Sequence, residues 1–485
     1  MQDLAREVQG RGGRLAALWG TDERERGAGF ALQAAFVVEA SLVWMEVPLA
    51  ADRPCYPNLA DIYPCANRMQ RALRDLLGIE AEGAIDARPW LRHGAWPADA
   101  YPLRRDVPAD RTWSNGIEPY PFVQVEGDGV HEIPVGPVHA GIIEPGHFRF
   151  SIVGEKVLRL EERLGYVHKG IDKRFESLDI SGGARLAGRI SGDSTVASSW
   201  AYAMAAESIA GITPPPRGLW LRALALERER IGNHLGDLGY LGNDGGLAFG
   251  LAQFMRLKED VVRLNAETFG HRYLMDVVVP GGIARDCDRA GIEAVLAQCT
   301  ALEGELRVLR DIYDDHAGLQ DRFLTCGILD PELAAKLSVI GLAGRASGQA
   351  WDARVAPSFE PYDRLAVNMK LARAGDVAAR VALRFDEILE SIRLIRAIAE
   401  GMPGGEIASA LPAGLTGRGI GWVEGWRGEF IVALELAGDR VGRCHAHDPS
   451  WQNWPALEHA VIGNIVPDFP LINQSFNLSY SGQDI

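Results

Sequence analysis

The sequence predicts an α+β protein built from two modules, and three observations lead to this prediction. Residues 1–106 have the pattern of a helix, several strands and a second helix over residues 67–77. A stretch rich in proline, glycine and aspartate follows over residues 107–130 and is typical of a linker. Residues 131–485 begin with strand patterns and continue, after Ser194, with helical periodicity. At 485 residues the chain is long enough for two or three domains.

The most apolar window, residues 30–49, is long enough to suggest a membrane span of about 20 residues. Three polar residues, Gln33, Glu39 and Glu46, interrupt it, and charges inside hydrocarbon are expensive. Its β-branched and aromatic residues favour paired strands. We therefore expect strands here, and we expect any association with a membrane to come through partner subunits.

Further elements follow along the second module. Residues 133–150 and 151–160 have strand patterns, with a turn at Gly154 and Glu155. A proline run at 214–216 predicts the start of a helix. Apolar residues then recur three, four or seven positions apart, at Trp220, Leu224, Ile231, Leu235 and Leu238. A long helix is predicted over residues 376–399, with five apolar residues facing inward: Val377, Val381, Ile388, Ile392 and Ile395.

Two polar patterns on these helices have more than one interpretation. The long helix carries Arg380, Arg384, Glu387 and Ser391 on one strip. Spacing alone favours a solvated face with modest ion pairs, and a buried polar network is the alternative. His234, in the motif Glu-Arg-x-x-Asn-His, is interpreted as a satisfied core histidine rather than a ligand. We therefore leave it out of the candidate site.

Composition and charge limit the possible partners. The formal net charge of −15 argues against a surface for nucleic acid or anionic lipid, since both require clustered basic residues. The six cysteines contain no Cys-x-x-Cys pair, so their spacing predicts buried reduced thiols rather than a zinc or iron–sulfur site. The first residues lack the basic and apolar regions of a signal peptide, which predicts a cytoplasmic location.

Two short segments place serine or glycine where a known metal-binding motif has cysteine. Residues 189–194 read Arg-Ile-Ser-Gly-Asp-Ser, and residues 477–482 read Asn-Leu-Ser-Tyr-Ser-Gly. They resemble the ligand motifs of nickel–iron hydrogenase large subunits, Arg-x-Cys-Gly-x-Cys and Asp-Pro-Cys-x-x-Cys. The four cysteine positions hold Ser191, Ser194, Ser479 and Gly482. Nickel and iron need thiolate sulfur there, and a serine hydroxyl stays protonated near neutral pH, so the resemblance implies a degenerate site without metal.

Other motifs extend the resemblance over about 350 residues, in family order. They are VGPVHAG (135–141), EPGHFR (144–149), YVHKG (166–170), ERIGNHL (229–235), PGGIARD (280–286), GRASG (344–348) and DFPLI (468–472). They resemble the large subunit of energy-converting, group 4 hydrogenases and the hydrogenase-derived, 49 kDa-type subunit of respiratory complex I. This resemblance implies that residues 131–485 form a domain with N-terminal strands and a long helical bundle.

The first module carries an independent resemblance to the small α+β subunit of complex I. It rests on YPNLADIYPCAN (56–67), DLLGI (75–79), Trp96-Pro97 and YPLRRD (101–106). A fusion of the two modules in this order resembles the large subunit of formate-hydrogenlyase-type complexes.

The resemblance also implies a set of site residues. Ser191 and Ser194, with Arg189 from the same motif, are expected to meet Ser479 in a polar cavity, although both serines also suit helix N-caps. Glu144 corresponds to a glutamate that passes protons in group 4 hydrogenases, and a surface strand carboxylate is the alternative. His139 and His147 lie in the segment that lines the quinone headgroup site of complex I. In complex I a tyrosine accompanies the histidine at this quinone site. That tyrosine has no counterpart in this chain, since Gly192 falls at its position.

These resemblances imply a subunit of a membrane-bound, ion- or proton-translocating oxidoreductase complex. The chain is expected to take part in electron transport to quinone, to bind no cofactor itself, and to rely on iron–sulfur clusters in a partner small subunit. Membrane antiporter-like and quinone-site subunits are the other implied partners. Three electron donors stay open: NADH, ferredoxin and formate. NADH as the donor would imply NAD binding and NADH dehydrogenase activity in the complex. The alternative is a structural, coupling subunit with an inert cavity. A third hypothesis, an active hydrogenase, is disfavoured by the four missing thiols.

Overall fold

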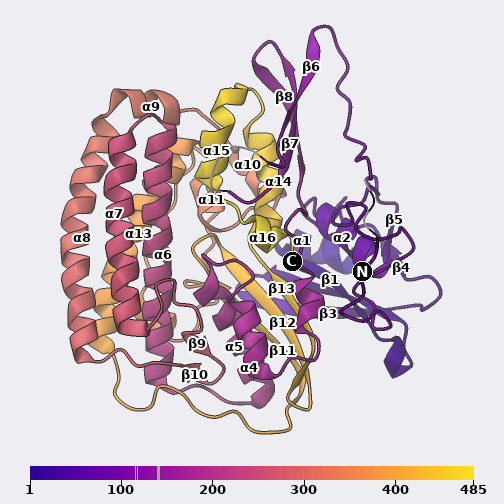
Figure 1. The fold of residues 1–485 in the computed structure, drawn as a ribbon, viewed down its shortest axis with the longest axis horizontal. Coiled ribbons are helices and arrows are strands. Elements are labelled where there is room, and N and C mark those ends of the chain that lie inside the picture. The colour runs from indigo at the N-terminus through magenta and orange to yellow at the C-terminus, as the bar shows by residue number, and fades with distance from the viewer. Residues whose placement is uncertain (115, 117, 139–142) are drawn as a thin grey trace.

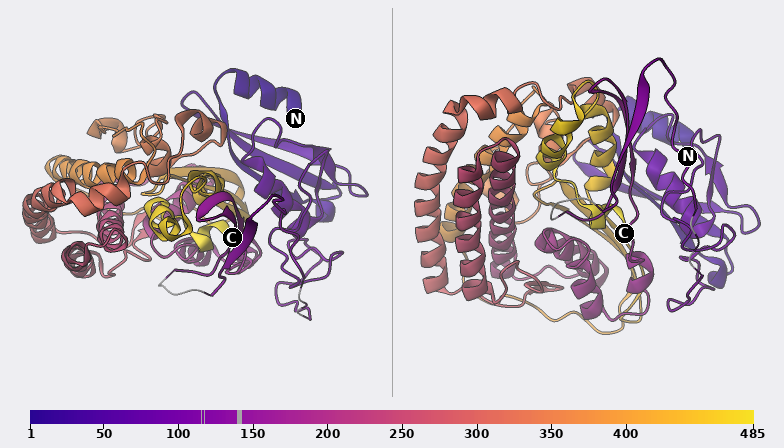
Figure 2. Two further views of the ribbon diagram at one scale, coloured as in Figure 1. Left: turned by 90° about the horizontal axis from the view of Figure 1, so that it is seen from above. Right: turned by 45° about the horizontal axis from the view of Figure 1, so that its top comes forward.

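The computed structural model describes residues 1–114, 116, 118–138 and 143–485. The N-terminal module lies at one side of the molecule, a helical bundle lies at the other, and the C-terminal sheet and helices lie between them (Figure 1). The two further views in Figure 2 show the same arrangement. The predicted α+β class is confirmed, with strands in the first module and a long helical bundle in the second.

The N-terminal module is an antiparallel sheet covered by helices. The sheet has the order β1 (Arg14–Asp22), β2 (Phe30–Val38) and β3 (Ser41–Leu49). The remaining elements of the module are α1 (Gln2–Gly10), η1 (Arg24–Arg26), β4 (Cys55–Pro57), α2 (Ala66–Leu77) and β5 (Glu80–Glu82).

The apolar window at residues 30–49 forms the β2–β3 hairpin, as the strand prediction requires. Strand β2 is buried on both faces: Leu32 and Phe36 pack with the helices, while Val37 packs against the C-terminal sheet. A strand buried on both faces has a continuous apolar sequence, which explains the resemblance to a span. Gln33 and Glu46, which interrupt the window, pair across the hairpin at 2.6 Å. Among the described residues, no helix combines the length and apolarity needed to cross a membrane.

The second module begins with a projecting antiparallel sheet of three strands. These are β6 (Val130–Val135), β7 (His147–Val153) and β8 (Lys156–Arg163), in sequence order. The turn between β7 and β8 lies at Gly154 and Glu155, as predicted. The predicted strand over residues 133–150 is too long, because β6 ends at Val135 and β7 starts only at His147. Three short or medium helices follow: α3 (Ile171–Phe175), α4 (Ile180–Ala187) and α5 (Thr195–Ala210).

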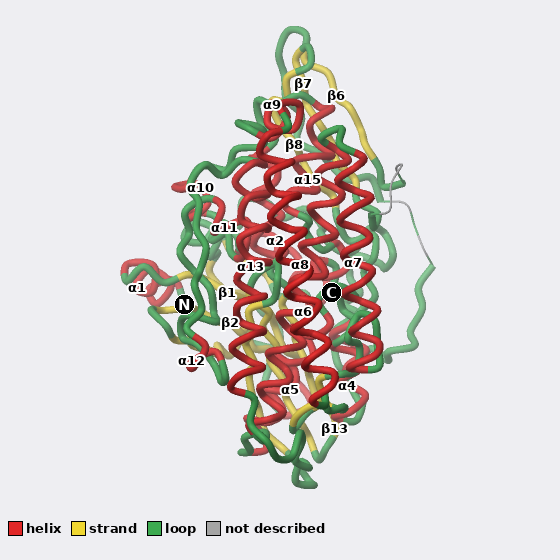
Figure 3. The backbone as a smooth tube through the Cα atoms, turned by 90° about the vertical axis from the view of Figure 1, so that its left-hand side faces the viewer, coloured by secondary structure: helices red, strands yellow, loops and turns green. Residues whose placement is uncertain are grey.

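Four long helices form the bundle, which Figure 3 shows from its outer face. They are α6 (Pro216–Asp244), α7 (Ala248–Phe269), α8 (Arg289–Asp315) and α13 (Val377–Gly401). Helix α6 starts at the proline run, as predicted, and Asp376 caps α13 by accepting the backbone N–H of Ala379 at 2.8 Å. Short elements connect these helices: β9 (Val278–Val279), β10 (Gly282–Ile283), α9 (Ala317–Phe323), α10 (Pro331–Lys336), α11 (Gly341–Ala346) and α12 (Tyr362–Leu365).

The C-terminal region supplies the sheet that joins both modules. It contains β11 (Thr416–Glu424), β12 (Glu429–Ala437), β13 (Arg440–His447), α14 (Ser450–Ala460), η2 (Val466–Asp468), α15 (Phe469–Phe476) and α16 (Tyr480–Gln483). Helix α5 lies directly on β11, since a Cβ on Gly421 would stand 1.8 Å from the carbonyl oxygen of Ala201. The other face of the sheet packs against β1 and β2, where Arg14 forms a bidentate ion pair with Glu429 at 2.5 Å.

Candidate functional site

Two of the candidate serines meet although they are far apart in the sequence. Ser191 lies in the turn between α4 and α5, and Ser479 lies just before α16. Their Oγ atoms are 2.9 Å apart, and both residues are buried. The Ser479 Oγ also accepts the backbone N–H of Gly482 at 2.9 Å and so caps α16. The fold therefore brings together the two segments that resemble cysteine motifs.

Ser194 stands at the N-terminus of α5, but its side chain does not cap that helix. Glu229 of α6 does so instead, because its carboxylate accepts the N–H groups of Val196 at 2.7 Å and of Ala197 at 3.3 Å. Burial raises the pKa of Glu229 to about 8. The Ser194 Oγ accepts from Arg427 Nη1 at 3.2 Å. Ser194 is therefore part of the candidate site rather than a side-chain cap.

An ion pair fills the space beside the serines. Arg427, in the turn between β11 and β12, donates to both carboxylate oxygens of Asp193, at 2.7 and 2.6 Å. Burial opposes ionisation of Asp193, but the Arg427 guanidinium outweighs it and holds the pKa of that carboxyl at about 2. Ser191 Oγ donates to the same carboxylate at 2.7 Å.

Neither member of this pair was predicted from the sequence. Asp193 lies inside the first motif, at a position that the motif leaves open, while Arg427 lies 234 residues away in a turn that has no motif of its own. A cavity beside the ion pair is lined by Asp193 and Glu229 but by none of the three serines, and it leaves about 20 Å³ of free volume. The hydroxyls thus contact each other and the ion pair rather than open space.

Glu144 reaches this cluster from the opposite side. Its carboxylate accepts the backbone N–H of Ser481 at 2.9 Å, although the residue itself is exposed. From there the Ser481 Oγ lies 3.4 Å from the Ser479 Oγ, which leads on to Ser191. An exposed carboxylate is therefore joined to the buried serines through one backbone amide and a run of hydroxyls.

The other candidates lie elsewhere. His147 is buried at the start of β7, with its Nδ1 3.0 Å from the carbonyl oxygen of Gly136 and its ring beside Phe122. Burial lowers the pKa of His147. Arg189 forms an exposed ion pair with Asp276, at 2.6 and 2.7 Å, and makes no hydrogen bond to the serines. His139 lies outside the described residues.

Comparison with known proteins shows a family for each module. Residues 1–112 match the family described as the respiratory-chain NADH dehydrogenase 30 Kd subunit, and residues 244–416 match the 49 Kd subunit family. Formate hydrogenlyase subunit 5 of Escherichia coli is 31% identical over 487 residues, which cover 98% of this chain and 85% of that protein. The chain belongs to the family of group 4 hydrogenase large subunits and fused complex I subunits.

Other members of the family agree with this assignment. The carbon monoxide-induced hydrogenase of Rhodospirillum rubrum is 32% identical, covering 72% of this chain and 97% of that protein. The fused C/D subunit of an NADH-quinone oxidoreductase from Bacteroides thetaiotaomicron is 27% identical over 80% of this chain and 77% of its own length. A chain of the archaeal membrane-bound sulfane sulfur reductase shares the fold, with a TM-score of 0.69 at 24% identity, over 74% of this chain and 99% of its own.

Within this family fold, the polar strip of α13 is buried. Arg380, Arg384, Glu387 and Ser391 are each at most 3% exposed, so the solvated-face interpretation is wrong and the buried network is correct. Spacing misled here because α13 packs against α6, α8, α11 and α15 and leaves no solvated side for the strip. His234 is also fully buried, with Nε2 2.9 Å from a Glu387 oxygen, as expected of a core histidine.

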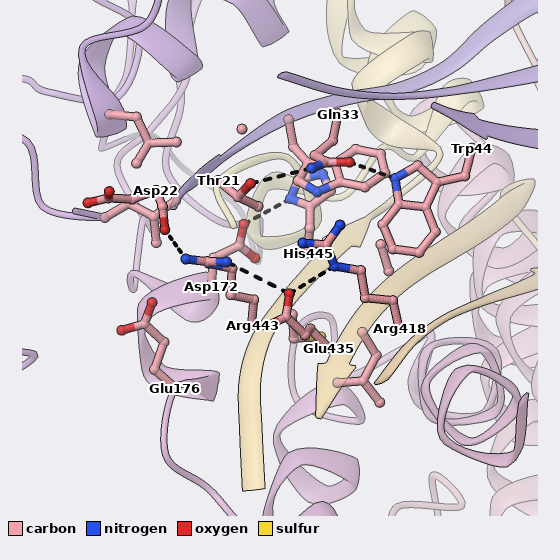
Figure 4. A pocket seen from close by; sticks show the side chains of 17 residues that line it. Thr21, Asp22, Gln33, Trp44, Asp172, Glu176, Arg418, Glu435, Arg443 and His445 are labelled. Atoms are coloured by element: carbon pink, nitrogen blue, oxygen red, sulfur yellow. Dashed lines mark hydrogen bonds and ion pairs between the residues drawn. The ribbon is translucent and has the colours of Figure 1, made fainter. Parts of the chain in front are cut away.

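A second polar cavity lies between the N-terminal module and the C-terminal sheet of this chain (Figure 4). No sequence pattern predicted it. His445 of β13 forms a 2.8 Å hydrogen bond to Asp172, and the ring of Trp19 stacks on the imidazole at 5.0 Å. The cavity leaves about 40 Å³ of free volume, which is room for about three water molecules. In the described part of the chain, no group of three or more histidine, cysteine or acidic side chains is arranged to hold a metal ion.

Proposed function

We propose that this chain is a subunit of a membrane-associated oxidoreductase complex and carries no nickel–iron centre. One observation carries the second part of the proposal: the Ser191 and Ser479 hydroxyls bond to each other at 2.9 Å where hydrogenases of this family have thiolates. Hydroxyls that stay protonated near neutral pH are poor ligands for nickel and iron. The Arg427–Asp193 ion pair adjoins these hydroxyls, since Ser191 Oγ donates to the Asp193 carboxylate.

The names of the relatives support the first part of the proposal. They include a formate hydrogenlyase subunit and NADH-quinone oxidoreductase subunits, which are oxidoreductase components. In this proposal the redox centres are iron–sulfur clusters of a partner small subunit, and membrane antiporter-like and quinone-site subunits complete the complex. The chain itself takes part in electron transfer to quinone that is coupled to ion or proton translocation, at the cytoplasmic face of the membrane. NADH, ferredoxin and formate are the candidate donors.

The proposed quinone headgroup site lies between the 139–147 segment and the floor formed by the three serines. Two contacts support this location. Glu144, within the segment, is joined to the C-terminal turn through Ser481, and His147 places an imidazole at the end of the same segment. In this proposal a histidine of the segment donates to a quinone carbonyl and supplies a proton on reduction, and Glu144 resupplies that proton.

A second candidate function is a coupling role with an inert cavity. The observation that favours it is the saturation of the serine hydroxyls, which bond to each other, to Asp193 and to Arg427. In that case the chain transmits conformational change between an iron–sulfur subunit and membrane subunits, without contacting quinone.

Analysis of the purified complex tests the proposal. We expect no stoichiometric nickel by elemental analysis and no hydrogen-dependent dye reduction, together with quinone reduction when the physiological donor is supplied. Stoichiometric nickel would overturn the absence of the metal centre. Intact quinone reduction in variants of both the histidine segment and the serine floor would favour the coupling role instead.

A further inference from the structure

The centre of the bundle holds a network of ionisable side chains that the candidate site does not use. It lies where α6, α11 and α13 meet the end of β11, and each member is at most 3% exposed. Its members are Glu227, Arg230, His234, Arg345, Asp352, Arg354, Tyr362, Glu387, Ser391 and Glu424. No solvent is available to these groups, so their charges must be balanced by one another.

Arg345 links three carboxylates of the network. Its Nη2 donates to Glu387 Oε1 at 2.8 Å, and its Nη1 donates to Glu424 Oε1 at 2.9 Å. The same Nη1 lies 3.6 Å from an Asp352 oxygen. Two carboxylates therefore share a single guanidinium nitrogen, an arrangement that disfavours ionisation of both at once.

The charges of the network do not balance when every group has its usual state. Four carboxyls, of Glu227, Asp352, Glu387 and Glu424, face three guanidiniums, of Arg230, Arg345 and Arg354. One negative charge would thus remain unpaired in the protein interior, where an isolated charge is very unfavourable. One bound proton removes the imbalance, either on His234 or on a carboxyl.

His234 is the poorer place for that proton. Its Nε2 bonds to Glu387 at 2.9 Å, but its Nδ1 is buried and has no hydrogen-bond partner among the described residues. A protonated imidazole would have to bury a second N–H without an acceptor. Burial also lowers the pKa of His234.

Among the carboxyls, Glu424 has the weakest support for a negative charge. Glu387 accepts from Arg345 and His234 and lies near Arg230, and Asp352 forms a bidentate pair with Arg354 at 3.0 and 2.7 Å. Glu227 accepts from Arg354, Tyr362 and Ser391. Glu424 accepts from one nitrogen of Arg345 and, at 3.1 Å, from the backbone N–H of Ala353.

We propose that this network binds one proton at neutral pH, held by Glu424 beside the ionised carboxylate of Asp352. Proton binding here does not depend on the function proposed above. Burial and the neighbouring Asp352 charge raise the pKa of Glu424 to about 7, in agreement with the geometry. Two charged groups that flank the network are paired outside it: Glu429, opposite Glu424 on β12, with Arg14, and Asp237, near His234, with Arg384. Two others have no ion pair among the described residues: Glu229, next to Arg230 on α6, whose pKa burial raises to about 8, and Arg380 of α13, which donates to Ser475 and to backbone carbonyls.

The position of Glu424 links this proton to the candidate site. Glu424 is the last residue of β11, and the turn that follows it carries Trp426 and Arg427. The backbone oxygen of Glu424 accepts from Arg230 Nη2 at 2.9 Å, so the turn is anchored to the network. A change of charge at Glu424 therefore acts three residues from the guanidinium that binds Asp193 and Ser194.

The pH dependence of stability tests the proposal on the full chain. A carboxyl whose folded pKa is raised to about 7 stabilises the fold fully below its unfolded pKa, and that contribution is lost as pH rises through 7. Glu424→Gln mimics the protonated acid, so it should unfold close to wild type at pH 5 and at a higher midpoint than wild type at pH 8. Glu387→Gln is the matched control and should be destabilised at both pH values, since it removes an ionised carboxylate.

Infrared spectroscopy gives a second measurement that does not depend on variant stability. Because Glu229 and Asp484 are also buried carboxyls with a raised pKa, the signal of Glu424 is the difference between two spectra. Wild type should absorb more strongly than Glu424→Gln in the protonated carboxyl region at pH 6, and this excess should weaken by pH 8.5. Equal destabilisation of Glu424→Gln and Glu387→Gln at pH 5 and 8 would overturn the proposal. So would spectra at pH 6 in which wild type shows no excess of protonated carboxyl absorption over Glu424→Gln.

Discussion

The serine site and the buried network differ in how their charges are balanced. At the serine site, Ser191, Ser194 and Ser479 surround a single one-to-one ion pair between Arg427 and Asp193, so the local charge is balanced. In the network, four carboxyls face three guanidiniums, and balance requires a proton. The serine site thus has no excess charge, whereas the proposed proton gives the network a charge that changes with pH. The contrast predicts where substitutions will have large effects and where small ones.

The largest effect is expected from Arg345→Ala. This change leaves the ionised carboxylate of Glu387 and the carboxyl group of Glu424 buried without their shared guanidinium, which should destabilise the fold by about 3–5 kcal/mol. Denaturant unfolding of the full chain measures the loss. Arg189→Ala is the control, since its exposed pair with Asp276 should contribute less than about 1 kcal/mol. Similar losses in both variants would mean that the network is not a buried charge cluster.

Arg427→Ala should come next, at about 2 kcal/mol, because it removes a buried guanidinium and leaves Asp193, whose side chain is 38% exposed, without its partner. Adding Asp193→Asn to the same chain should restore part of the stability, since the uncompensated charge is then removed. The two single variants and the double variant form a cycle whose coupling term is measured by unfolding. Strictly additive losses would contradict the balanced-pair description of the serine site.

The second of these predictions rests on Arg427, which the sequence did not indicate, and the reason is distance along the chain. Helix α13 was predicted over 376–399 and forms over Val377–Gly401, because its cap and its apolar period are local signals. Ser191 and Ser479 were placed together only through the family resemblance, which carries long-range information. Arg427 and Glu424 have no local motif, so their roles emerge only once the β11–β12 turn is folded against α5 and α6.

Introducing cysteine at positions 479 and 482 tests how closely the serine site is packed. Ser479→Cys should be tolerated, whereas Gly482→Cys should cost about 1–3 kcal/mol, because a Cβ there would stand 2.4 Å from an Asp448 oxygen. Gly304→Cys is the control, as a helical glycine with open space around it. The unfolding midpoints of the three variants measure these effects. A wild-type midpoint for Gly482→Cys would show that position 482 has room for a side chain.

His147→Ala sharpens the functional side of the comparison. If quinone binds beside this segment, loss of a hydrogen-bond partner should weaken the reaction by about 1–3 kcal/mol, seen as slower quinone reduction by the assembled complex. His131→Ala, an exposed histidine on the same sheet, is the control and should leave turnover unchanged. The make-up of the purified complex must be compared in parallel, because an assembly defect imitates the loss. Unchanged turnover in correctly assembled His147→Ala would favour the coupling role.

Ser191→Ala should have the smallest effect. Its hydroxyl donates to Asp193 at 2.7 Å and contacts the Ser479 Oγ at 2.9 Å, but each partner keeps another bond: Asp193 to Arg427, and Ser479 to the N–H of Gly482. No buried charge is left unpaired, so the loss should be near ~1 kcal/mol, the usual net contribution of a neutral hydrogen bond. Denaturant unfolding at neutral pH measures it. A loss of about 3 kcal/mol or more is the size expected for a broken buried ion pair. Such a loss would mean that the serine hydroxyls stabilise the fold as strongly as the charged network does, and it would contradict the contrast between the two regions.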